Sequence, residues 1–137
     1  MLGEVSMKLS KLQRKVWRYK LHQLRKHFSP GVPVEVRSMP LKGIEADCGP
    51  VMKLGRLVKI TIRINSKARW SIKVDSLMHE WAHAMEWEAN WAVNSPKKEH
   101  GETWGVWYAK IYRHLVDKCW EDMRARKLLT KNQLASE

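Results

Sequence analysis

Two histidines and a glutamate stand in the short stretch MHEWAHAMEW, which begins at Met78. His79 and His83 are four residues apart, so a helix would place their imidazoles side by side, close enough to bind one metal ion. Glu80 lies farther round such a helix, where it can reach a metal-bound water as a general base but cannot be a third ligand. The HExxH spacing therefore predicts a hydrolytic site with Zn2+ as its cofactor.

A hydrolytic zinc site usually has three protein ligands and one open position, so a third ligand is expected downstream. His100 is one candidate, at the start of the next predicted helix, and Glu102 is the other. Their side chains would lie about 200° apart around a helix, so they cannot both face one ion. We favour His100, because Glu102 has a separate use as an acid beside the positive end of the helix dipole. Trp104 should anchor that turn and fix the direction of His100.

The chain resembles the SprT-like metallopeptidases, a family that includes Spartan. The resemblance covers about residues 45–120 and rests on three features of the sequence: HEWAH at 79–83, HGETW at 100–104, which is similar to the family motif HGxxF, and a strand of the ITIRIN kind that ends at Asn65. It implies a compact zincin fold, peptidase activity and zinc ligation by His79, His83 and His100. By similarity to Spartan it also implies action on DNA-associated proteins.

The expected reaction is the hydrolysis of peptide bonds by a zinc metalloendopeptidase. Zinc would lower the pKa of its bound water toward 7, while Glu80 takes the proton of that water and later passes it to the leaving amine. The predicted strand that ends at Asn65 could align an extended substrate by strand addition. Tyr108, Tyr112 and His114 are weaker candidates for oxyanion stabilisation, and we assign them to the core or the surface.

The charge of the chain indicates a polyanionic partner. Lys and Arg number 26 against 14 acidic residues, which gives a net charge of +12 and a pI near 10.0. Residues 1–30 contain eight Lys or Arg and a single acid. The basic residues recur at helical steps of three and four, in a stripe that consists of Lys8, Lys11, Lys15, Arg18, His22 and Arg25. With few acids to form intrahelical pairs, the stripe is expected to bind nucleic acid, and a solvated helix face is the alternative.

The hydrophobic periodicity predicts a single α+β domain over residues 1–137, and the resemblance to the SprT-like family implies a compact zincin-like fold for this domain. Alternation along 56–65 gives one apolar strand face, and a stripe in the last helix runs from Trp104 to Cys119. Ser71 is the expected N-cap of the HExxH helix. The expected elements are a basic amphipathic helix at 6–28, strands at 32–65 in a small antiparallel sheet or hairpin around Gly55, with a break at 48–50, the HExxH helix at 71–93, a final helix at 101–123 and a polar tail at 124–137.

The two cysteines, Cys48 and Cys119, lie far apart in the sequence and have no CxxC partner. This argues against a disulfide framework or a cysteine-ligated zinc ribbon, and it favours free thiols in or near the core. No apolar run approaches the length of a membrane span or a signal peptide, so we expect a cytoplasmic protein without a membrane partner.

Two alternatives belong to other functional classes. A nucleic-acid-binding module with a structural or degenerate zinc site would keep the basic stripe and tolerate the loss of Glu80. A basic adaptor without metal would carry His79 and His83 only as part of a helix face. A structural site needs a fourth protein ligand, and HExxH arises by chance in roughly 2% of chains of this composition, so the peptidase is the preferred interpretation.

Overall fold

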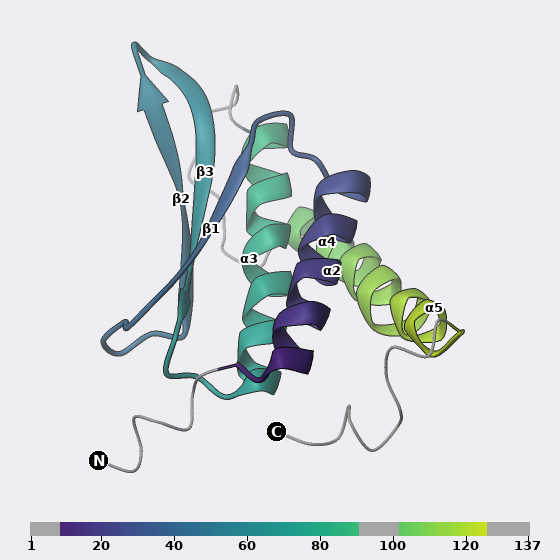
Figure 1. Ribbon diagram of the computed structural model, residues 1–137. Helices are drawn as coiled ribbons and strands as arrows, with labels where there is room; N and C mark the ends of the chain where they lie inside the picture. Colours follow the sequence, from purple (N-terminus) through teal and green to yellow (C-terminus); the bar gives the residue numbers. More distant parts are fainter. Residues whose placement is uncertain (1–8, 91–101, 126–137) are drawn as a thin grey trace.

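The structure, a computed structural model, describes residues 9–90 and 102–125 (Figure 1). Helix α3 lies between a small sheet on one side and helices α2 and α4 on the other (Figure 1). This arrangement confirms the expected α+β class. The elements are, in chain order, α2 (Lys11–His27), β1 (Val34–Met39), β2 (Ala46–Lys53), β3 (Arg56–Asn65), α3 (Trp70–Asn90), α4 (Glu102–Tyr112), the π-helical segment η2 (Arg113–Lys118) and α5 (Cys119–Ala125).

The sheet is mixed, with strand order β1-β3-β2. β2 and β3 form the predicted antiparallel hairpin around Gly55. β1 pairs with the other side of β3 in the parallel direction, with Val34 opposite Ile60 and Met39 opposite Asn65. The expected antiparallel sheet was therefore wrong for β1, because alternation predicts which face of a strand is buried and not the direction of a distant partner strand.

β2 continues through Cys48, Gly49 and Pro50, where the sequence predicts a break. Pro50 stands opposite Ile60, whose N–H donates to the Pro33 carbonyl on the β1 side at 3.0 Å. In an antiparallel ladder, the main-chain groups of such a pair point away from the shared interface, so the nitrogen of Pro50 faces the outer edge of β2. An edge strand tolerates proline there because no N–H is required.

The core fills the space between the inner face of the sheet and α3. The buried row of β3 consists of Ile60, Ile62 and Ile64, as the alternation predicts. The buried residues of α3 include Met78, Trp81, Ala82 and Met85, together with Leu77 and Ala84. Since α3 has neighbours on both sides, it is buried over more of its circumference than a single apolar face would require.

Two helix starts differ from the predicted ones. α2 begins at Lys11 rather than at residue 6, because Ser10 and Gln13 form a capping box. The Ser10 hydroxyl accepts from the Gln13 N–H at 3.1 Å, and the Gln13 side chain accepts from the Ser10 N–H at 3.0 Å. α3 begins at Trp70, so Ser71 lies inside the helix and is not its N-cap.

The last helix changes its hydrogen-bond register in η2. The Cys119 N–H donates to the carbonyl of His114, five residues back, whereas an α-helical bond would reach Leu115. The ammonium of Lys20, on α2, donates to the Leu115 carbonyl at 3.3 Å in a buried contact. Lys20 is only 6% exposed although its side chain is ionisable, and it lies among the apolar residues of α2. The π-helical turn thus presents an acceptor to a buried lysine.

The other predicted element boundaries lie close to the observed ones where the structure describes the chain. Of the stripe in the last helix, Ile111, Leu115 and Cys119 are buried, while Trp104 and Tyr108 are half-buried. The predicted end of the HExxH helix at 91–93 and most of the tail lie outside the described residues. Within the described parts of the chain, no helix has both the length and the apolar character needed to cross a bilayer.

Candidate metal centre

The two imidazoles of the HExxH stretch lie next to each other on α3. The ring centroids of His79 and His83 are 5.1 Å apart, with the ring planes at 65°. Their side chains are 31% and 15% exposed, so neither is sealed inside the core. Two adjacent imidazoles are a donor set that fits zinc, which binds one nitrogen of each ring.

Glu80 is buried beside this pair, at the contact of α3 with β2. Its side chain is 11% exposed, and Oε2 lies 3.8 Å from Nε2 of His79. Across the contact, Cys48 of β2 is close enough to sense the carboxylate. Burial, followed by the charges of Glu80 and Asp47, raises the pKa of Cys48 to about 12. The Cys48 thiol therefore stays protonated at neutral pH, and both cysteines are free, as predicted.

Trp104 of α4 packs against both imidazoles. Its ring centroid lies 4.9 Å from that of His79 and 5.7 Å from that of His83. The indole N–H also donates to the backbone carbonyl of His79 at 3.2 Å. One indole thus joins α4 to α3 and restricts the rotamers of both histidines. The sequence suggested an anchoring role for Trp104 toward His100, but not this contact with the histidine pair.

Tyr108 continues the aromatic row one turn farther along α4. Its ring stacks on Trp104, with centroids 5.0 Å apart and planes at 14°. The phenol donates to the carboxylate of Asp75 on α3 at 2.7 Å. Burial, followed by the hydrogen bond with Asp75, raises the pKa of Tyr108 to about 12. The phenol is thus neutral at pH 7 and tied to α3; the i, i+4 spacing of Trp104 and Tyr108 is the sequence signal for this row.

The other two candidates for oxyanion stabilisation lie farther from the histidine pair. Nε2 of His114 is 2.8 Å from Oε1 of Gln23, which places this histidine against α2. Burial, followed by the charges of His27 and Lys118, lowers the pKa of His114. Tyr112 is 43% exposed, one turn beyond Tyr108. These positions agree with the surface and core roles that the sequence suggests.

The third ligand is the part of the site that stays a prediction. His100 lies outside the described residues. Glu102 is the exposed first residue of α4. Within residues 9–90 and 102–125, no three His, Cys, Asp or Glu side chains form a group that could hold a metal ion. The described residues supply two ligands of the predicted three.

The open edge of the sheet lies on the Glu80 side of α3. β3, the strand expected to align a substrate, is paired on both sides from Ile60 to Asn65 and cannot accept another strand there; that expectation was wrong. The edge strands of the described sheet are β1 and β2. In β2, Cys48 has the same orientation opposite Ile62 as Pro50 has opposite Ile60. The N–H and C=O of Cys48 therefore point away from β3, toward a side where no described strand pairs with β2.

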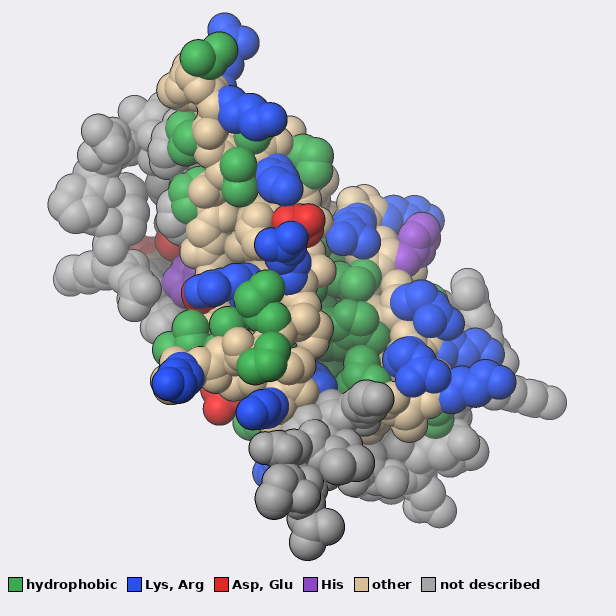
Figure 2. All heavy atoms as spheres, turned by 60° about the vertical axis from the view of Figure 1, so that its left-hand side comes forward, with side chains coloured by type: hydrophobic (Ala, Val, Ile, Leu, Met, Phe, Trp, Pro, Cys, Tyr) green, Lys and Arg blue, Asp and Glu red, His purple; other side chains and the backbone are tan. Residues whose placement is uncertain are grey.

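α2 carries the predicted basic stripe on its exposed side. The helix contains no acidic residue. Lys/Arg side chains gather over it at the right of Figure 2. The exposed members within the described residues are Lys11, Lys15, Arg18, His22 and Arg25, and none forms an ion pair with another described residue. Lys8, the first predicted member, lies outside these residues.

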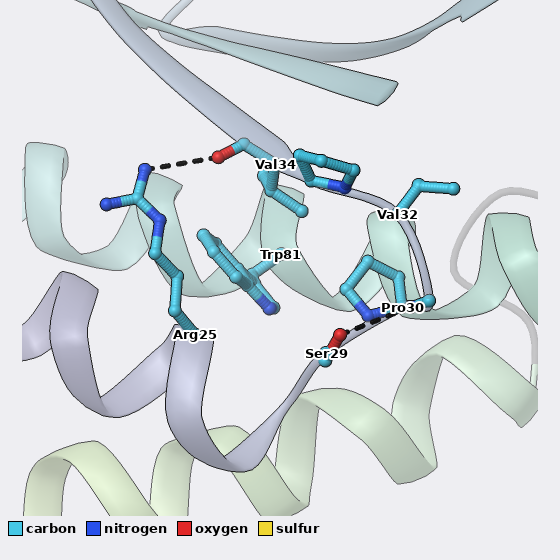
Figure 3. Close-up of a pocket in the computed structure, with 8 residues that line it drawn as sticks. Arg25, Ser29, Pro30, Val32, Val34 and Trp81 are labelled. Carbon is cyan, nitrogen blue, oxygen red and sulfur yellow. Dashed lines mark hydrogen bonds between the residues drawn. The ribbon is translucent and has the colours of Figure 1, made fainter. Parts of the chain in front are cut away.

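A hollow of about 530 Å³ opens where the end of α2, the loop before β1 and α3 meet (Figure 3). Arg25 forms one side and donates to the Val34 carbonyl at 3.1 Å. Trp81 forms the floor, and its indole N–H donates to the Phe28 carbonyl at 2.8 Å. No member of the HExxH stretch other than Trp81 lines this hollow, so it is separate from the candidate metal centre.

Comparisons of the chain with protein-family models, with curated proteins and with solved structures found no match. Function is therefore inferred from the side chains and their geometry.

Proposed function

We propose that the protein is a zinc-dependent peptidase of the SprT-like kind, with His79, His83 and His100 as the residues that would hold the metal. The observation that carries the proposal is the placement of two adjacent imidazoles, 5.1 Å apart, beside a buried glutamate on one helix. Zinc bound to such a donor set supplies Lewis acidity, which activates water and polarises a peptide carbonyl.

Glu80 is the proposed general base. Its carboxylate is buried, and one oxygen lies 3.8 Å from Nε2 of His79, so it can accept a proton from a water near that nitrogen. The same carboxyl group can then donate the proton to the leaving amine. Burial restricts this carboxylate to a small set of positions, which favours a defined direction of proton transfer.

The open edge of β2 is the proposed binding site for the substrate backbone. An extended peptide that pairs with the N–H and C=O of Cys48 would run along α3 on its Glu80 side. Pro50 contributes only its carbonyl to this edge, so the pairing would be strongest around Cys48 and Ala46. Main-chain pairing discriminates little between side chains, so the expected substrates are exposed, unfolded segments.

The decisive experiment compares Glu80→Gln with the wild type and with Glu121→Gln, which changes an exposed glutamate of α5. Casein cleavage, bound zinc and thermal melting are measured on the same preparations. Glu80→Gln should retain zinc and fold but lose cleavage by about 10²–10⁴-fold, because only the base is removed. Cleavage by Glu80→Gln at the wild-type rate would contradict the mechanism.

Nucleic-acid binding is the second candidate function, and the unpaired basic face of α2 favours it. Exposed cations without acidic partners gain most from contact with phosphates, because counterions are then released. Under the alternative in which zinc is only structural, this binding would persist and the loss of Glu80 would be tolerated, so Glu80→Gln should keep both bound zinc and nucleic-acid binding.

A further inference from the structure

The end of the β2–β3 hairpin projects from the sheet as a two-stranded ribbon. β1 pairs with β3 only from Ile60 onward, so within the described residues the ribbon from Val51 to Lys59 has no third strand. Figure 1 shows this end of the hairpin standing clear of the helices, at the upper left. Residues 52–56 and Val58 of this ribbon are exposed, while Val51, Leu57 and Lys59 are partly buried.

Leu54, at the tip, combines two unfavourable features. Its φ is +51°, which makes it the one non-glycine residue with positive φ in the described parts of the chain. Gly55 follows with φ +77°, so the turn has the left-handed conformation that favours Asn or Gly at its first position. The leucine side chain is also fully exposed, at 103%. A large apolar side chain held in a strained, exposed turn indicates a contact made outside the fold.

The surroundings of Leu54 are basic and apolar. Lys53 and Arg56 flank the turn, and neither has an ion-pair partner among the described residues, unlike Lys59, which lies 3.2 Å from Glu35. The sequence contains no acidic residue between Asp47 and Asp75. Met52 and Val58, each 36% exposed, add apolar surface close to the tip. Figure 2 shows hydrophobic and basic side chains together at this end, at the top of the view.

We propose that this ribbon tip, Val51–Lys59, contacts duplex nucleic acid, with Leu54 as a wedge against the bases and Lys53 and Arg56 on the phosphates. Proteins that bind the minor groove use Lys and Arg side chains and often insert an apolar side chain such as leucine between base steps, which partly unstacks them. The proposal rests on the nucleic-acid binding proposed for α2 and adds a second contact, far along the chain from the first.

An anionic membrane is the other polyanion that a basic, apolar tip could meet. One leucine buries less apolar surface than a single acyl chain, and such a chain alone gives only marginal, reversible membrane binding. The cations are also not confined to the tip, since α2 carries a further group. The distribution of charge therefore favours the duplex.

The test uses the full chain and a duplex of about 20 base pairs that carries 2-aminopurine, whose emission rises when it is unstacked. Leu54→Gly keeps all charges and suits the positive φ, so the variant should melt at the same or a higher temperature. Its dissociation constant from fluorescence anisotropy should nevertheless rise at least tenfold, and the 2-aminopurine signal should disappear. Val106→Ala, at an apolar position of α4 that is 49% exposed, is the control and should bind like the wild type.

A second variant, Lys53→Ala combined with Arg56→Ala, should weaken binding and reduce the slope of log K against log salt by about 1.8. Wild-type affinity and emission for Leu54→Gly would overturn the wedge. A different outcome is that the wild type binds phosphatidylserine vesicles, with Leu54→Gly abolishing this vesicle binding and leaving duplex binding unchanged. That result would show that the tip binds lipid, and it would also overturn the proposal. If the wild type binds no duplex at all, the function proposed for α2 fails as well.

Discussion

The ammonium of Lys20 donates a hydrogen bond to the carbonyl oxygen of Leu115, which joins the middle of α2 to the π-helical segment η2. Burial lowers the pKa of Lys20, and the nearby Cys119 opposes this shift only in part. This hydrogen bond therefore lies among buried apolar side chains, and the charged form of the lysine is disfavoured there.

The stability of the protein should depend on pH through Lys20. Its pKa in the folded state lies below the ordinary value of 10.5, so between these two values the unfolded chain binds more protons. Stability therefore rises as the pH increases through this window. Lys20→Met should lack that rise, so urea unfolding between pH 7 and 10 should show the wild type gaining stability relative to the variant. Lys15→Met, at an exposed position of α2, is the control and should follow the wild type.

Trp104 should control zinc affinity without being a ligand. Trp104→Ala removes the ring that packs on both imidazoles, so zinc affinity should fall at least tenfold and unfolding should cost about 2–3 kcal/mol less. Trp104→Phe keeps a ring in place and should restore most of the affinity. Trp107→Ala, on the same helix beside Lys110, is the matched control. Equal zinc affinity in all three variants would show that the imidazoles need no such support.

The third ligand can be identified by zinc titration. His100→Ala should lower zinc affinity by orders of magnitude, because three imidazoles are reduced to two. Glu102→Ala should change stability by less than about 1 kcal/mol, since Glu102 is exposed in the first turn of α4. The opposite order of effects would indicate a glutamate-ligated site and exclude the resemblance to the SprT-like pattern at this position.

The basic face of α2 should bind nucleic acid through its phosphates. The triple variant Lys11→Glu, Lys15→Glu and Arg18→Glu should bind a duplex far more weakly and with a shallower salt dependence. A variant with the same change in net charge reverses three exposed cations of the last helix, Lys110, Arg113 and Lys118. Equal losses in the two triple variants, measured by anisotropy at several salt concentrations, would reduce the effect to overall charge.

Local signals account for the parts of the fold that the sequence predicts. The buried row Ile60, Ile62 and Ile64 follows from alternation along one strand, and the apolar face of α3 follows from helical periodicity. The parallel pairing of β1 with β3 joins residues 26 positions apart, Val34 and Ile60, and no local pattern defines such a partner. The change of hydrogen-bond register in η2 could not be predicted from the local sequence either, because the lysine that it contacts lies in a different helix.

In the candidate site, too, contacts within one element could be predicted from the sequence, whereas contacts between elements could not. The spacing of His79, Glu80 and His83 is a property of one helix, and the adjacent imidazoles follow from it directly. Trp104 and Cys48 reach the site from other elements, so their contacts depend on how α4 and β2 pack on α3. The edge strand next to Glu80 is β2 rather than β3 for the same reason: strand order is a tertiary property.

A π-helical turn is equivalent to an α-helical turn with one additional residue. The number of residues in η2 therefore determines whether this part of the chain is π-helical or α-helical. Deletion of the exposed Asp117 should convert η2 into α-helix and supply the Leu115 carbonyl with a backbone donor. Lys20 would then compete with a backbone N–H for the Leu115 carbonyl while remaining buried. The deletion should therefore destabilise the protein less when it is combined with Lys20→Met than when it is made alone. The effect of removing a residue from the last helix thus depends on a side chain of α2.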